Sequence, residues 1–247
     1  MIQNDKAYKL LALQEGISNR AAKELIDRGA VYAAGKKILL ARADMKANTV
    51  FKIEKLKKPE IIFEDDKITA VNKPPFLTSE EVAQSFKLTL LHRLDKETSG
   101  VLLLSKDDEF TKKVIATFKA QKVVKTYLAV VSGRFAQSVT IDTPLQIMKT
   151  KSGAYAKPSK DGQSALSTVT PKFIEGKNSL VEVSIQTGRT HQIRAHLKSI
   201  GFPVMGDEKY GGKSASRIML HAWKISLLGY SFESPLTDDF AKFGKSV

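Results

Sequence analysis

Beyond residue 59, the spacing of apolar and polar positions predicts strands more often than helices. Two short strand patterns flank the acidic turn 64–66, which predicts a hairpin, and residues 101–104 form a continuous apolar run typical of a buried strand. The expected strands are residues 61–63, 67–71, 101–104, 123–131, 166–170, 180–186 and 225–232. Helices are expected over residues 107–118 and 190–199. Because strands outnumber helices and are often successive, we expect an α+β domain with a mixed, mainly antiparallel central sheet.

Residues 1–58 have a pattern of their own. Ser18 or Asn19 can cap a helix that ends at Gly29. Short strand patterns follow over residues 30–32, 38–40 and 50–53. A basic run over residues 52–58 ends at Pro59 and is typical of a linker. The sequence therefore predicts a small first domain, residues 1–58, and a second domain, residues 59–247.

The charge of the chain is strongly positive and unevenly distributed. The 247 residues include 40 Lys and Arg against 26 Asp and Glu, a formal net charge of +14. Residues 1–58 carry +7 of it on less than a quarter of the chain. Such a balance indicates a polyanionic partner, nucleic acid above all, although ribosome-associated and acidic-lipid-binding proteins share it.

Several classes of protein are excluded by what the sequence lacks. There are no cysteines, which excludes disulfides, thiolate metal sites and cysteine nucleophiles, and which suits a reducing compartment. No apolar stretch reaches the roughly 18 residues of a membrane span. The first residues also lack the apolar core of a secretory signal. We therefore expect a cytoplasmic protein that makes no use of a membrane.

Familiar catalytic patterns are missing as well. The chain contains no GxxxxGK[ST] phosphate loop, no GxGxxG turn after a strand and no GxSxG elbow. His191 and His196 are five residues apart, whereas a spacing of four places two metal ligands on one helix face. The sequence predicts neither a metal nor a cofactor.

Two polar loops carry the residues best suited to chemistry. Residues 92–100 place two cations and Asp95 directly before a buried strand, which is the rigid support that a catalytic carboxylate needs. Residues 186–194 bring Arg189 to the start of a helix. A buried aspartate tends to take up a proton unless a cation stands beside it. Asp95 and Arg189 are one of several possible pairs, and each loop can equally be a solvated turn with a surface ion pair.

Five stretches of the second domain carry a family resemblance. Residues 92–107 read HRLDKETSGVLLLSKD, which closely resembles the active-site motif of the RluA-like RNA pseudouridine synthases. Four further stretches agree with that family's motifs in order, namely residues 68–74, 125–131, 187–194 and 201–222. Two segments depart from it. The loop 75–90 lacks the usual Gly-Leu after Asn-Lys-Pro, and residues 232–235 have Glu-Ser where the family has a His before Pro.

The resemblance implies that the protein isomerises a uridine within RNA to pseudouridine, using no cofactor or metal. It implies that Asp95 is the catalytic carboxylate, that Arg189 pairs with it and that Tyr127 packs on the target base. Asp95 can act as a nucleophile at C1′ or as a base at C2′, and both roles stay open. Arg93 could fill the gap that a flipped base leaves in the stack. Further candidates for RNA contact are His92, Lys73 and Arg194.

The first domain carries a second resemblance. Residues 16–38 read GISNRAAKELIDRGAVYAAGKKI, which resembles the αL RNA-binding module of the S-four-like type. The match departs at residues 33–36, which read Ala-Ala-Gly-Lys where that family has Val-Asn-Gly-Lys. The resemblance implies phosphate contacts from Arg20, Lys23, Arg28, Lys36 and Lys37. The alternative is a generic basic helix and hairpin that caps the larger domain.

The RNA substrate is indicated only by the first domain. Members of the family with such a module mostly modify large-subunit ribosomal RNA, so the resemblance favours ribosomal over transfer RNA. Two alternatives stay open, a transfer RNA pseudouridine synthase and a non-catalytic RNA-binding factor for ribosome assembly. The set of Asp95, Tyr127 and Arg189 favours an enzyme, because a binding module has no need of it. No obligatory protein partner is indicated, and a monomer is the default.

Overall fold

The chain divides into two compact units, Met1–Lys58 and Pro59–Val247. The structure is a computed structural model that describes residues 4–54, 57–150 and 153–240. Within these ranges, no helix is both long and apolar enough to cross a lipid bilayer.

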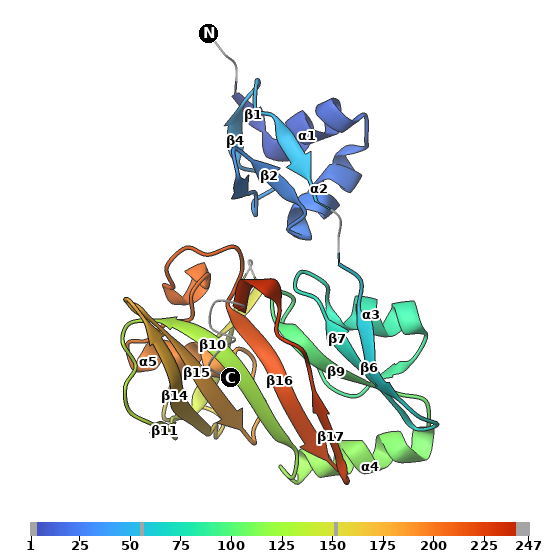
Figure 1. The fold of residues 1–247 in the computed structure, drawn as a ribbon, viewed down its shortest axis with the longest axis vertical. Helices are drawn as coiled ribbons and strands as arrows, with labels where there is room; N and C mark the ends of the chain where they lie inside the picture. Colours follow the sequence, from blue (N-terminus) through green and yellow to red (C-terminus); the bar gives the residue numbers. More distant parts are fainter. Residues whose placement is uncertain (1–3, 55–56, 151–152, 241–247) are drawn as a thin grey trace. The chain divides into compact units, whose positions relative to one another are not determined.

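Two helices, a three-stranded sheet and a two-stranded ribbon make up the first unit. These elements are β1 (Asn4–Lys6), α1 (Ala7–Glu15), α2 (Asn19–Asp27), β2 (Val31–Ala33), β3 (Lys36–Lys37), β4 (Asp44–Lys46) and β5 (Phe51–Ile53) (Figure 1). α1 ends at Gly16, whose φ of 64° is left-handed and suits glycine. Ser18 caps α2, because its Oγ accepts a hydrogen bond from Ala21 N at 3.1 Å. The apolar sides of both helices meet in a core around Leu11 and Ile26.

A ten-stranded sheet forms the second unit, in the order β11-β14-β15-β10-β16-β9-β7-β6, with β17 on β16 and β8 on β9. Its strands are β6 (Glu60–Glu64), β7 (Ile68–Lys73), β8 (Thr89–Leu90), β9 (Ser99–Ser105), β10 (Val124–Ser132), β11 (Val139–Ile141), β14 (Ser167–Glu175), β15 (Asn178–Ile185), β16 (Leu220–Leu227) and β17 (Tyr230–Glu233). All strand pairs of the sheet are antiparallel except β9 with β16. The predicted α+β class with a mixed, mainly antiparallel sheet is confirmed.

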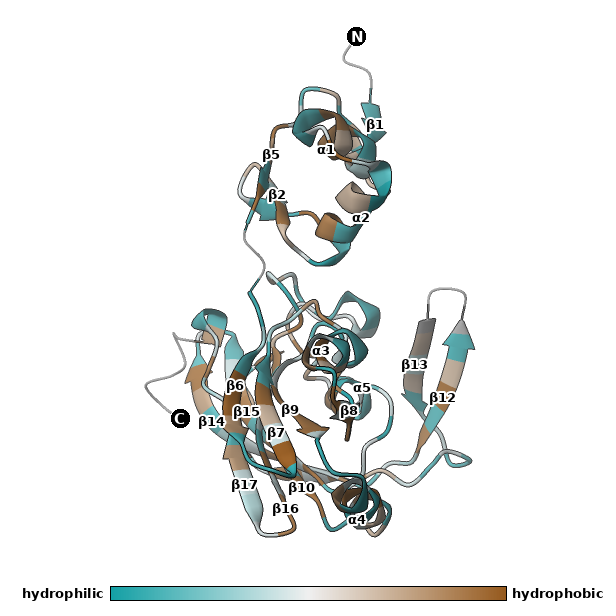
Figure 2. Cartoon of the chain, turned by 90° about the vertical axis from the view of Figure 1, so that its right-hand side faces the viewer, coloured by the Kyte–Doolittle hydropathy of each residue, from teal (hydrophilic) through white to brown (hydrophobic). Residues whose placement is uncertain are grey.

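Helices and a separate hairpin complete the second unit. They are α3 (Ser79–Phe86), α4 (Asp108–Lys119), α5 (Gln192–Ser199), the 3₁₀ helix η1 (Glu208–Tyr210), and the strands β12 (Leu145–Thr150) and β13 (Gly153–Pro158). Figure 2 shows the β12–β13 hairpin standing apart from the large sheet.

Strand β9 is buried on both faces, which explains its unbroken apolar run. Val101 and Leu103 pack in the cluster that contains α4, whereas Leu102 and Leu104 pack in the cluster that contains α3. At its start, Gly100 has a φ of 115°, and a Cβ there would lie 2.1 Å from the carbonyl oxygen of Ala222. Only glycine fits this close approach of β9 to β16. The loop that precedes β9 is thereby fixed to the centre of the sheet.

The structure differs from the sequence-based expectations at several places. In the first unit, residues 38–40 are not a strand: Ala34 and Gly35 both have positive φ and form a two-residue hairpin turn, so the returning strand is β3, Lys36–Lys37. Helix α1, strands β8 and β11 and the β12–β13 hairpin were not expected.

Residues 225–232 are not one strand but the hairpin of β16 and β17, because Leu228 and Gly229 both have positive φ, as a tight two-residue turn requires. Helix α3 was not expected, although Thr78 and Glu81 form a capping box with the spacing that predicts a helix start. The other predicted strands and both predicted helices of the second unit are present, with bounds shifted by a few residues.

Candidate active site

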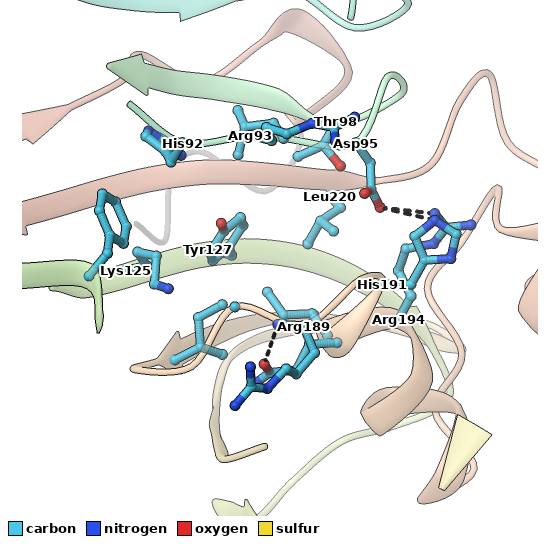
Figure 3. A pocket seen from close by; sticks show the side chains of 16 residues that line it. His92, Arg93, Asp95, Thr98, Lys125, Tyr127, Arg189, His191, Arg194 and Leu220 are labelled. Atoms are coloured by element: carbon cyan, nitrogen blue, oxygen red, sulfur yellow. Dashed lines mark hydrogen bonds and ion pairs between the residues drawn. The ribbon is translucent and has the colours of Figure 1, made fainter. Parts of the chain in front are cut away.

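A pocket of about 310 Å³ lies where three segments meet: residues 91–98, here called the Asp95 loop, strand β10, and residues 185–194, which lead into α5 (Figure 3). Its volume is at the lower end of the range of roughly 300–1,000 Å³ typical of small-molecule sites. Its charged and polar lining residues are His92, Arg93, Asp95, Thr98, Lys125, Tyr127, Arg189, His191, Gln192 and Arg194.

Hydrogen bonds hold the Asp95 loop in one conformation. Ser79 Oγ, at the start of α3, accepts from Leu94 N at 2.9 Å. Leu103 N in β9 donates to His92 Nε2 at 3.2 Å. Thr98 N donates to the carbonyl oxygen of Asp95 at 3.0 Å. The Asp95 loop is therefore tied to helix α3 and to strand β9, the buried strand that the sequence placed directly after it.

Lys73, the last residue of β7, is fully buried beneath the same loop. Its Nζ donates to the carbonyl oxygens of Pro74, Leu77 and Lys96 at 3.0, 2.8 and 3.1 Å. Burial lowers the pKa of Lys73 to about 7, but three acceptors use all three protons of an ammonium group and so favour the charged form. The expectation that Lys73 contacts RNA is wrong, because no phosphate can reach it.

Asp95 is held by an arginine that is itself held by a second carboxylate. Arg194 Nη1 donates to Asp95 Oδ2 at 2.9 Å. On its other edge, Arg194 binds Asp207 in a fork, with Nε 2.6 Å from Oδ2 and Nη2 2.9 Å from Oδ1. Asp207 is fully buried, whereas 28% of the Asp95 side chain is exposed. In the described part of the chain, Asp95 Oδ1 has no hydrogen-bond partner, so this oxygen is available to a substrate.

Arg189 does not pair with Asp95, contrary to the expectation from the sequence. Its Nε donates to the carbonyl oxygen of Ser164 at 2.9 Å, and Figure 3 shows its guanidinium directed away from Asp95. The difference lies in the backbone, since Arg189 precedes α5 while Arg194 lies inside it and is buried between the two carboxylates. Arg194, expected to contact phosphate, is instead the partner of Asp95.

Strand β10 presents Tyr127 to the pocket. A bulge in the pairing of β10 with β16 falls between Thr126 and Tyr127, and bulges commonly re-aim a side chain next to a functional site. Burial, and in second place the charge of Asp95, raises the pKa of Tyr127. The phenol therefore keeps its proton at neutral pH.

The end of the pocket away from Asp95 contains Lys125, two residues before Tyr127 on the same face of β10. Lys125 Nζ donates to the carbonyl oxygen of Thr187 at 2.9 Å. Burial, and then the charge of Arg189, lowers the pKa of Lys125 to about 8. Burial, and then the charge of Lys125, lowers the pKa of His92 to about 3. His92 is therefore neutral and adds no charge for RNA binding.

The other candidates for RNA contact lie at the surface or near it. Arg93 Nε is 2.8 Å from Glu80 Oε1, but both side chains are more than half exposed, so RNA can displace this weak ion pair. In the first unit, Arg20 and Lys36 are exposed. Lys23 Nζ lies 4.2 Å from the ring centroid of Tyr8, and Lys37 Nζ lies 5.2 Å from that of Tyr32. Arg28 forms an ion pair with Glu24 at 2.7 Å. RNA contact by these residues stays a prediction.

The site also contains residues that the sequence did not single out. Lys125 could have been found from strand alternation, because it shares a face with Tyr127. His191 was considered only as a metal ligand, yet its Nε2 lies 3.8 Å from Asp95 Oδ2. Across the described ranges, no three His, Asp or Glu side chains are close enough together to hold a metal ion. Nothing in the spacing predicted Asp207, because it lies 13 residues beyond Arg194 and meets it only in the fold.

Comparisons with known proteins bear on this arrangement. A family model described as RNA pseudouridylate synthase matches residues 56–199. An uncharacterized RNA pseudouridine synthase of Helicobacter pylori J99 is 49% identical over 240 residues, which is 96% of this chain and 99% of the relative.

Two further relatives have different named substrates. A tRNA pseudouridine synthase C of Haemophilus ducreyi is 32% identical over 66% of this chain and 82% of its own length. A ribosomal large subunit pseudouridine synthase C of Rickettsia prowazekii is 34% identical over 68% of this chain and 62% of its own length. Among solved structures, human RNA pseudouridylate synthase domain containing 4 matches the fold with a TM-score of 0.63 at 23% identity, covering 74% of this chain and 90% of that one.

Proposed function

The chain belongs to the RNA pseudouridylate synthase family, and from that premise we propose that Asp95 is its catalytic carboxylate and large-subunit ribosomal RNA its substrate. The assignment of Asp95 is supported by the geometry of its carboxylate. Oδ2 of Asp95 is held by Arg194 at 2.9 Å, while Oδ1 has no partner among the described residues, and Asp95 lines a pocket with Tyr127.

The reaction needs a positioned anion next to the ribose. The C1′–N1 bond of uridine breaks, the uracil turns, and a C1′–C5 bond forms while C5 loses a proton and N1 gains one. A carboxylate can serve as the nucleophile at C1′ or remove the proton at C2′, and either role requires direct contact with the sugar. A partly exposed carboxylate, fixed by a buried arginine, supports both roles for Asp95.

The size of the pocket supports a flipped nucleotide. About 310 Å³ accommodates one nucleoside but not a stacked segment of RNA. An enzyme that acts on a base inside a duplex must extrude it, at a cost of a few kcal/mol. Tyr127 then packs on the uracil, and Arg93, exposed at the pocket rim, is the proposed residue that fills the vacated place.

The proposal for ribosomal RNA rests on the first unit. Residues 1–58 carry +7 and expose Arg20 and Lys36, so a second basic surface is available to an RNA with structure beyond the target nucleotide. Relatives are named for both ribosomal and transfer RNA, and the substrate must therefore be tested directly.

Mapping of pseudouridine by carbodiimide modification in total RNA tests the substrate. A strain that lacks the protein should lose a pseudouridine in large-subunit ribosomal RNA, because no other enzyme is then expected to modify that site. The wild-type gene should restore it, and a gene with Asp95→Asn should not. Loss of a pseudouridine in transfer RNA instead would contradict the ribosomal proposal while leaving Asp95 as the catalytic residue.

The basic residues of the first unit should act through phosphates. Replacing Arg20 and Lys36 by Gln should lower the slope of log affinity against log salt by about 1–2, since each lost phosphate contact removes roughly 0.7–0.9. The single-turnover rate at saturating RNA should be unchanged. Binding isotherms at several salt concentrations measure the slope.

A charge-matched control separates phosphate contact from net charge. Lys6 and Lys9 are already paired, with Nζ 2.7 Å from Asp44 and 3.1 Å from Asp5. Their replacement by Gln removes the same two charges and should change the salt slope less. Equal slopes in the two double variants would mean that Arg20 and Lys36 make no specific contact.

A further inference from the structure

His191 has an unusual backbone conformation beside Asp95. Its φ is 52°, in the left-handed region, which is uncommon for a residue other than glycine, and it precedes the first turn of α5. Strained backbone of this kind is common at functional sites, where it aims a side chain. The imidazole of His191 reaches the pocket between Tyr210 and Asp95, and 14% of its side chain is exposed.

The hydrogen bonds of Tyr210 determine which nitrogen of His191 carries the proton. Tyr210 Oη accepts from Ala156 N at 2.7 Å, so its own proton needs an acceptor. His191 Nδ1, at 3.2 Å, is the one acceptor that the described residues offer. Burial also lowers the pKa of His191, which favours the neutral ring. Nδ1 therefore accepts, and Nε2 carries the proton.

This proton is directed at the catalytic carboxylate without reaching it. His191 Nε2 lies 3.8 Å from Asp95 Oδ2, which is too long for a hydrogen bond. Both groups line the pocket, so the gap between them is open to a ligand. One side of the gap is a donor and the other an acceptor. A hydroxyl group, which is both an acceptor and a donor, complements the two sides.

We propose that His191 Nε2–H and the Asp95 carboxylate together bind the 2′-hydroxyl of the flipped ribose, and that this pair helps the enzyme to select RNA over DNA. The inference rests on the proposed function, because it requires the ribose to lie beside Asp95. The 2′-hydroxyl is the group that distinguishes the two nucleic acids at a given nucleotide. Tyr210 acts as a positioning residue, since it fixes the tautomer that gives His191 its donor.

A cycle of enzyme and substrate variants tests the pair. Two RNA oligonucleotides are compared in single turnover, identical except that one carries 2′-deoxyuridine at the target. The deoxy change also alters the reactivity of the glycosidic bond. The measured quantity is therefore the rate with the ribose oligonucleotide divided by the rate with the deoxyribose oligonucleotide, taken for each enzyme. We expect this ratio to be on the order of tenfold smaller in His191→Asn than in the wild type, the size of one lost hydrogen bond.

The first variant, His191→Asn, is chosen to keep the backbone conformation. Asn tolerates the left-handed conformation and is too short to place a donor at the position of Nε2. His191→Gln can place its amide nitrogen there and should recover part of the discrimination, which a purely structural role would not produce. An unchanged ratio in His191→Asn would overturn the inference. A wild-type enzyme that forms no pseudouridine in the ribose oligonucleotide would instead contradict the proposed function.

Discussion

Replacement of Asp95 by Asn is expected to abolish pseudouridine formation while leaving RNA binding nearly intact. The amide is almost isosteric but can act neither as a nucleophile nor as a base. General acid–base groups alone contribute about 10²–10⁴-fold to a rate, and in the described residues no other carboxylate lines the pocket. Single-turnover assays should therefore show no product. RNA affinity should change by less than about tenfold, or ~1.4 kcal/mol.

Two matched variants sharpen this expectation. Asp95→Glu keeps the charge but moves the carboxylate by about 1 Å, which costs on the order of 10²-fold in a positioned site. Glu97→Gln removes a carboxylate from the same loop, but Glu97 does not line the pocket, so its turnover should stay close to that of the wild type. Wild-type turnover in Asp95→Asn, together with loss in Glu97→Gln, would transfer the catalytic role to Glu97.

Much of the fold follows from local pattern. The longer strands of the large sheet were predictable because alternating or continuous apolar runs report burial on one or both faces of a sheet, whereas β8, β11 and the β12–β13 hairpin were not predicted. The hairpin of β16 and β17 was missed because Leu228 takes a positive φ without being a glycine. Its turn therefore has only one residue, Gly229, that the sequence marks as a turn former.

The charged residues of the site were harder to predict than the strands. Arg189 and Arg194 lie five residues apart in one motif, and the sequence does not show which of them meets Asp95. The choice depends on where α5 begins and on Asp207, both of which are set by tertiary structure. Lys73 is the last residue of the buried strand β7. Its position in that strand was a better guide to its burial than its charge. A basic residue near a predicted RNA site is thus as readily a structural support as a contact.

Removal of Arg194 is expected to damage both stability and turnover. Arg194→Met leaves the fully buried Asp207 without its ion-pair partner, and loss of one member of a buried ion pair costs about 3–5 kcal/mol. It also frees Asp95 from the hydrogen bond that orients it. Urea unfolding should show the loss of stability, and single-turnover assays below the unfolding transition should show a rate reduced on the order of 10²-fold or more.

Loss of turnover in Arg194→Met has two possible causes, unfolding and misplacement of Asp95, and two further variants separate them. Arg194→Met combined with Asp207→Leu removes both buried charges, so it should regain much of the stability, yet turnover should stay low because Asp95 still lacks its partner. Arg189→Met removes a guanidinium whose one hydrogen bond within the described ranges runs from Nε to a backbone carbonyl. This variant should be stable and, at saturating RNA, turn over within about tenfold of the wild type. If Arg189→Met loses turnover and the double variant keeps it, Asp95 depends on Arg189 in the complex with RNA, and the pairing with Arg194 belongs to the free enzyme alone.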